Sequence, residues 1–148
     1  MEAKELLEIT ESFRASIGTI LKKSKQQLEK RLKEQGEEIT AHQYAILVRL
    51  SKGNLTVKEL GEKFSIEPPT LIPIIDLLER KKLLVRIPDL KDRRRKLLQV
   101  TERGNELIGN MRSNIKSDAV AQAFLRMGKE KSETLIRLLQ QMAKELQD

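Results

Sequence analysis

The sequence contains no cysteine and only one histidine. Without thiols there are no disulfides, no thiol redox chemistry and no cysteine-ligated metal, and one imidazole cannot build a multi-histidine site. The chain also lacks a glycine-rich phosphate loop and a nucleophile–base pattern. We therefore expect no enzyme, no catalytic residues, no metal site and no cofactor. A serine-based site is the one catalytic alternative left open.

Long apolar runs and aromatic residues are also scarce. No run approaches the ~20 residues that a membrane span requires, and the amino terminus alternates charges. We therefore expect a cytoplasmic protein that does not associate with membranes. Aromatic residues make up 3% of the chain, which leaves few rings on which single-stranded bases could stack. Double-stranded DNA is the better candidate partner.

Positive charge is abundant. There are 29 Lys and Arg against 22 Asp and Glu, a net charge of +7. Six cations and two anions between Arg86 and Lys96 give that stretch alone a charge of +4. Such an excess favours a polyanionic partner, nucleic acid or an anionic membrane surface. The 148 residues suit one folding unit.

Apolar residues recur at helical spacing through most of the chain. They predict a long amphipathic helix over 3–35, with Gly18 as the point where it would bend. A helix of this length exceeds what a small domain can cover, so we expect part of it to pack on a second chain. Capping boxes that begin at Thr40 and Thr56 predict helices over 41–52 and 57–64. Pro68 suits the first turn of a fourth helix, which reaches about residue 82.

Two β-prone runs, 83–87 and 97–100, flank the charged stretch and predict a hairpin with a basic tip. Thr101 is expected to cap a long helix that continues through Phe124, and Ser132 to begin the last helix. The predicted fold class is therefore mainly α with a small β-hairpin wing. It is a winged helix-turn-helix at 40–101, flanked by N- and C-terminal helices within a single domain over 1–148.

Three segments carry a family resemblance: ITAHQYAILVRL, LTVKELGEKFSIEPPTLIPIIDLLERKKLLVR and DLKDRRRKLLQVTERG. In these segments the chain resembles the MarR family of transcriptional regulators, especially its SlyA-like branch. The resemblance implies a homodimer, with dimerisation helices in 1–36 and 102–148, that acts as a repressor at pseudo-palindromic promoter sites. Many members release DNA when a small anionic or phenolic ligand binds. The chain departs from the pattern at Pro73, Ile74 and Lys82, where an arginine, a small polar residue and a glycine are usual.

The fourth helix is the first predicted DNA contact. Its first two turns should face base edges, which makes Pro68, Pro69, Thr70 and Pro73 the candidate surface. Only Thr70 can donate a hydrogen bond, so we expect weak direct readout, with apolar groups near thymine methyls. The alternative is that these prolines only set the start of the helix.

The hairpin tip is the second predicted contact. By resemblance, Arg94 enters the minor groove, Asp92 orients it, and Arg93 lies alongside. Lys91 and Arg95 would contact phosphates. The alternative is a solvated charge run. Further phosphate candidates, near the turn before the fourth helix, are Lys58, Lys63 and Ser65.

A ligand site is predicted where the second helix begins. His42 and Tyr44 lie there, and Arg14 and Arg86 could approach them in a family-like dimer, which would suit an aromatic acid or a phenolic effector. The alternative makes Tyr44 a staple residue and His42 an exposed first-turn residue. For the whole chain, the alternative function is an architectural DNA-binding protein or a protein-interaction module without an effector.

Overall fold

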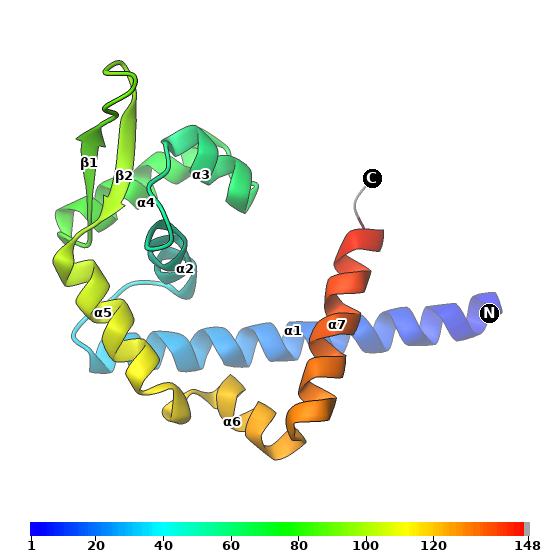
Figure 1. The fold of residues 1–148 in the computed structure, drawn as a ribbon. Helices are drawn as coiled ribbons and strands as arrows, with labels where there is room; N and C mark the ends of the chain where they lie inside the picture. Colours follow the sequence, from blue (N-terminus) through cyan, green and yellow to red (C-terminus); the bar gives the residue numbers. More distant parts are fainter. Residues whose placement is uncertain (147–148) are drawn as a thin grey trace. The chain divides into compact units, whose positions relative to one another are not determined.

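The computed structural model describes residues 1–146; Gln147 and Asp148, the end of the predicted C-terminal region, lie outside the described residues. Residues 1–146 form seven α-helices, one short 3-10 helix and a two-stranded antiparallel hairpin (Figure 1). The predicted fold class is confirmed. The elements are, in order, α1 (Ala3–Glu34), α2 (Ala41–Leu50), α3 (Val57–Phe64), α4 (Pro68–Arg80), β1 (Leu84–Pro88), β2 (Lys96–Val100), α5 (Glu102–Ser113), η1 (Ile115–Ser117), α6 (Ala119–Met127) and α7 (Lys129–Glu145).

The chain divides into two compact units. The first, which we call the lobe, is Leu28–Ser113; the second, the flanking unit, is Met1–Gln27 together with the described residues from Asn114 onward. The lobe includes all of 40–101, the range expected for the winged helix-turn-helix. The last turns of α1 and all of α5 belong to it, because Leu32 and Leu107 are buried in the same cluster as the residues of α2.

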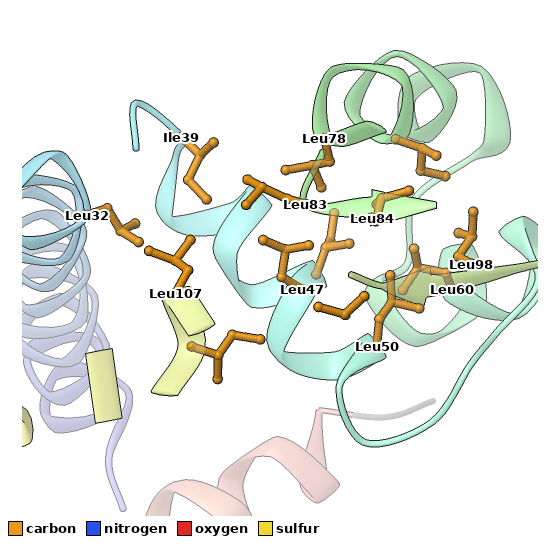
Figure 2. Packing of buried hydrophobic residues seen from close by; sticks show 14 of the residues in the cluster. Leu32, Ile39, Leu47, Leu50, Leu60, Leu78, Leu83, Leu84, Leu98 and Leu107 are labelled. Atoms are coloured by element: carbon orange, nitrogen blue, oxygen red, sulfur yellow. The ribbon is translucent and has the colours of Figure 1, made fainter. Parts of the chain in front are cut away.

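The core of the lobe is aliphatic. Figure 2 shows Leu32 and Leu107 at one end of the cluster, Leu60 and Leu98 at the other, and Leu47 of α2 between them. All five are at most 5% exposed. Because each buried leucine stabilises the fold by about 1.5 to 3 kcal/mol, this cluster fixes α3, α4 and the hairpin on one scaffold.

Local capping places the helices of the lobe. Both predicted capping boxes are present: in the second, Thr56 accepts a hydrogen bond from the Glu59 amide at 3.2 Å, and the Glu59 carboxylate accepts one from the Thr56 amide at 2.8 Å. α3 then ends at Phe64 and is capped by Ser65, whose backbone is left-handed (φ 52°, ψ 45°). Gly61 permits this tight turn, since a Cβ there would lie 2.6 Å from the carbonyl oxygen of Ile66.

The predicted helix from Thr101 through Phe124 is wrong. α5 ends at Ser113 and α6 begins anew at Ala119. The reason is Asp118, whose carboxylate accepts hydrogen bonds from the amides of Val120 and Ala121, both at 3.0 Å, and so starts a separate helix.

Other boundaries also differ from prediction. α2 ends at Leu50, two residues before the predicted end. α7 begins at Lys129 instead of Ser132, directly after Gly128 with φ 81°, and the Ser132 hydroxyl donates to the Gly128 carbonyl oxygen at 2.7 Å. α4 ends at Arg80, two residues before the predicted end, because Lys82 adopts a left-handed φ of 59°. Among the helices of residues 1–146, none combines the length and the apolar character that crossing a membrane requires.

Candidate nucleic-acid interface

The hairpin carries the predicted basic tip. β1 and β2 pair from Leu84 opposite Val100 to Pro88 opposite Lys96. The amide of Leu98 also donates to the carbonyl oxygen of Leu55 at 2.7 Å, which ties β2 to the segment before α3. The base of the hairpin is thus fixed to the lobe, while its tip projects beyond the helices (Figure 1).

At the tip, Arg94 and Asp92 form a two-pronged ion pair. Nε and Nη2 of Arg94 donate to the two carboxylate oxygens of Asp92 at 3.1 and 3.3 Å, and the Arg94 amide adds a third hydrogen bond at 3.1 Å. Two hydrogen bonds lower the pKa of the Asp92 carboxyl: the one from the Arg94 side chain has the larger effect, and the one from the Arg94 amide the smaller. The side chain of Arg94 is nevertheless 92% exposed. This arrangement fixes the direction of a guanidinium that remains open to a partner.

Arg95, predicted to contact a phosphate, has an intramolecular partner. Its Nη2 lies 3.0 Å from Oε1 of Glu59. Glu59 is the capping residue of α3, and the hydrogen bond from the Thr56 backbone is the main cause of its lowered pKa. This pair was not predicted, because 36 residues separate its members and no local spacing in the sequence indicates it. Lys91 and Arg93 are exposed at the same tip.

The predicted α4 residues lie at the surface. Pro68, Pro69, Thr70 and Pro73 are all exposed, and α4 runs through Pro73. Ile72, which is 42% exposed, was not among the predicted residues. Pro69 lies three residues before Ile72 and four before Pro73, and this spacing could have revealed that all three share a face.

The turn before α4 brings together three of the predicted residues. Lys58, Ser65 and Pro68 line one pocket, and Lys58 and Ser65 are exposed. A cation and a hydroxyl therefore lie beside the start of α4, and both groups are able to bind a phosphate of a DNA backbone. Lys63 is exposed in the last turn of α3.

The predicted ligand residues have separate neighbours. Arg86 donates to Asp76 at 2.7 Å and to Glu79 at 2.5 Å, both on α4. The hydrogen bond with Asp76 is the main cause of the raised pKa of Arg86. This arginine therefore links β1 to α4. Arg14 belongs to the flanking unit.

The two α2 residues have other surroundings. Burial raises the pKa of Tyr44, against the opposing charges of Arg112 and Arg31. The ring of His42 meets that of Phe64 edge-on, with centroids 5.6 Å apart. Within the lobe, the charges that act on Tyr44 are thus those of Arg112 and Arg31. No group of three or more metal-ligating His, Asp or Glu residues was found in the part of the chain that the structure describes.

The fold and this surface define a winged helix-turn-helix protein. The sequence profile of the MarR family matches residues 39–96. The HTH-type transcriptional regulator SarZ of Staphylococcus epidermidis is 32% identical over 112 residues, which cover 74% of this chain and 71% of SarZ. With these two matches, the chain belongs to the MarR family.

Solved structures agree in fold. The MepR–DNA complex of Staphylococcus aureus matches with a TM-score of 0.74 and 25% identity, over 90% of this chain and 98% of that chain. A cysteine-to-serine mutant of Escherichia coli MarR, complexed with operator DNA, has a TM-score of 0.77 at 24% identity, over 91% of this chain and 95% of that chain. The MarR structure supports the fold alone.

Proposed function

We propose that this chain is a DNA-binding transcriptional regulator, a homodimeric repressor of pseudo-palindromic promoter sites. The observation that carries the proposal is the pairing of Arg94 with Asp92 at a hairpin tip, where Arg94 is held in direction and still 92% exposed. The name of SarZ and the DNA complex of MepR support the same function.

The chemistry of the tip suits a minor groove. Arginine carries five N–H donors, and Asp92 uses two of the side-chain N–H groups of Arg94, so three remain for base edges and sugars. A narrow A·T-rich minor groove has an enhanced negative potential that attracts an inserted guanidinium. Lys91, Arg93 and, once released from Glu59, Arg95 would contact the phosphates on either side.

A second copy of the chain would cover the apolar surface of the flanking unit. Leu6, Ile9 and Leu21 of α1 and Leu138 of α7 are each at least 50% exposed. We propose that the dimerisation helices lie in 1–36 and 102–148, as the MarR resemblance implies. Sedimentation of the purified chain would test this: a monomer at micromolar concentration contradicts the homodimer.

Anisotropy titration of the duplex immediately upstream of the chain's own gene tests the DNA contact. Arg94→Ala should weaken binding by roughly tenfold or more. Arg80→Ala removes an exposed arginine from the last turn of α4 and should leave the affinity unchanged. Equal affinity of Arg94→Ala and the parent chain would exclude the assigned role.

Footprinting separates this function from its alternatives. Protection of two half-sites about 34 Å apart supports a dimeric regulator. Uniform coverage instead supports an architectural DNA-binding protein. Absence of binding even at low salt supports a protein-interaction module.

We further propose release by an aromatic acid or phenol, and membership of the SlyA-like branch. Half-buried Tyr44, under the charges of Arg112 and Arg31, is the observation that favours an anionic aromatic ligand in the lobe. A panel of aromatic acids and phenols should lower operator affinity. An affinity that no compound changes contradicts effector release and leaves DNA binding standing.

A further inference from the structure

The exposed start of α4 carries a chemistry that the hairpin lacks. We infer that Pro69, Ile72 and Pro73 form an apolar ridge that recognises thymine by its 5-methyl group in the major groove. This inference rests on the proposed function, since it assumes that α4 enters DNA. In this view α4 selects the bases, while the wing and α3 bind the DNA backbone through their positive charges.

The ridge follows from the helical register. Residues three and four apart share one face of a helix, so Ile72 and Pro73 lie on the same face as Pro69. All three are exposed, with Ile72 at 42%. Leu71 and Ile75, on the opposite edge of α4, are fully buried and anchor it to the lobe. The ridge is therefore a fixed surface feature of a well-packed helix.

The first turn of α4 has few backbone donors to offer a phosphate. A helix usually presents free amides at its start, which favour anions. Here Pro68 and Pro69 have no N–H, and the amides of Thr70 and Leu71 both donate to the Glu67 carbonyl oxygen, at 3.0 and 3.1 Å. Whatever α4 recognises, it recognises through side chains.

Those side chains are almost entirely hydrocarbon. From Pro68 to Ile75 only the Thr70 hydroxyl can form a hydrogen bond. Proline side chains have essentially no rotamer freedom to lose, so ordering two of them against a partner carries little entropic penalty. The ridge is thus a preorganised apolar surface. It adjoins the turn before α4, where Lys58 lines one pocket with Pro68 and with the acidic Glu62 and Glu67.

The thymine methyl is the one apolar group that a base displays in the major groove. Cytosine shows a hydrogen-bond donor, its N4 amino group, which hydrocarbon would leave unsatisfied. Contact with the ridge therefore favours T·A pairs and penalises C·G pairs. The occupant that fits both the ridge and the net charge of +4 on the hairpin stretch 86–96 is a run of thymines in duplex DNA.

Replacement of thymine by uracil tests the inference directly, because uracil lacks the methyl and keeps every hydrogen-bonding group. Duplexes selected by the chain from a random pool would be remade with deoxyuridine at one position at a time. Each contacted methyl should contribute about fourfold to the affinity, from about 0.8 kcal/mol per buried methylene-sized group. 5-Methylcytosine at a cytosine position serves as the converse probe.

A double-mutant cycle then links base to residue. At one position of each half-site, replacement of thymine by uracil should leave the affinity of Ile72→Ala unchanged. Val85→Ala, which trims an apolar side chain of β1 that is 38% exposed, should keep the preference for thymine. Thermal melting of both variants would confirm that each remains folded.

The outcomes are distinct. Sequence-selective binding that is unchanged by every uracil substitution overturns the ridge and leaves the proposed function intact. A preference for thymine that survives in Ile72→Ala also overturns it. If selection enriches no duplex, the proposed function fails, and the inference fails with it.

Discussion

Arg86 binds Asp76 across 2.7 Å, and a second hydrogen bond of 2.5 Å to Glu79 completes a bridge from β1 to α4. The side chain of Arg86 is 28% exposed, so water screens the bridge only in part. It joins the two elements that would enter neighbouring grooves. The bridge thus adds a polar link between α4 and the wing to the aliphatic core that both elements share.

Arg86→Met keeps the aliphatic stem and removes the charge. We expect the free energy of unfolding to fall by about 1 to 2 kcal/mol, since two charge-assisted hydrogen bonds at a partly exposed site are lost. Urea denaturation measures this, with Arg80→Met, at the end of α4, as the control. Because Arg86 binds carboxylates and not phosphates, the slope of log affinity against log salt should stay unchanged. A slope reduced by about one would make Arg86 a phosphate contact instead.

Gly104 packs where no side chain fits. A Cβ there would lie 2.4 Å from the carbonyl oxygen of Leu83 and 2.6 Å from a methyl of Val100. Gly104→Ala should therefore destabilise the fold by about 2 to 3 kcal/mol. Gly109, on the same helix, has no heavy atom within 4 Å of such a Cβ, and Gly109→Ala should stabilise the fold by about 0.5 to 1 kcal/mol. Equal melting temperatures for the two variants would contradict this packing.

Lys82 has the backbone of a glycine, with φ 59°. Lys82→Gly should stabilise the chain by about 0.5 to 1 kcal/mol, because the relief of left-handed strain exceeds the entropic penalty of glycine. Lys81, with φ −76°, gives the control, and Lys81→Gly should destabilise. Calorimetric melting of both variants checks the sign. A lower melting temperature for Lys82→Gly would contradict the expectation.

The lowered pKa of Glu59 predicts that the stability of the fold depends on pH. The pKa of Glu59 is lowered in the folded chain, chiefly by the hydrogen bond from the Thr56 backbone. A carboxyl group with a lowered pKa stabilises the fold at pH values above its pKa in the unfolded chain, about 4.3. This contribution is lost as the pH falls through its lower pKa in the folded chain. Glu59→Gln should therefore be less stable than the parent by about 0.5 kcal/mol at pH 7 and equally stable near pH 3. Glu62→Gln, on the same helix, is the control, and a pH-independent difference would contradict the assignment.

Local signals in the sequence predicted most of the fold. Thr40 and Thr56 begin helices in any context, because their capping hydrogen bonds join residues three apart, and both starts were placed correctly. The break before α6 was missed because apolar residues keep helical spacing from Met111 to Phe124, which concealed the cap at Asp118. The spacing of apolar residues alone does not reveal where one helix ends and the next begins.

The partners of the arginines could not be predicted in the same way. Glu59 and Arg95 are 36 residues apart, and the link from Arg86 to Asp76 depends on how β1 packs beside α4. Such pairs depend on tertiary packing and leave no periodic trace. The Asp92–Arg94 pair spans two residues of one turn, and there the resemblance to a known family was sufficient to place the two together.

The division of α4 into a buried edge and an exposed one has a consequence for engineering. Leu71, Ile75 and Leu78 hold the helix in place, while positions 69, 70, 72 and 73 are exposed and lie outside the core cluster. A library randomised at those four positions would sample new base preferences on an unchanged scaffold. Under the proposed function, such a library would direct the chain to other DNA sites without a redesign of its interior.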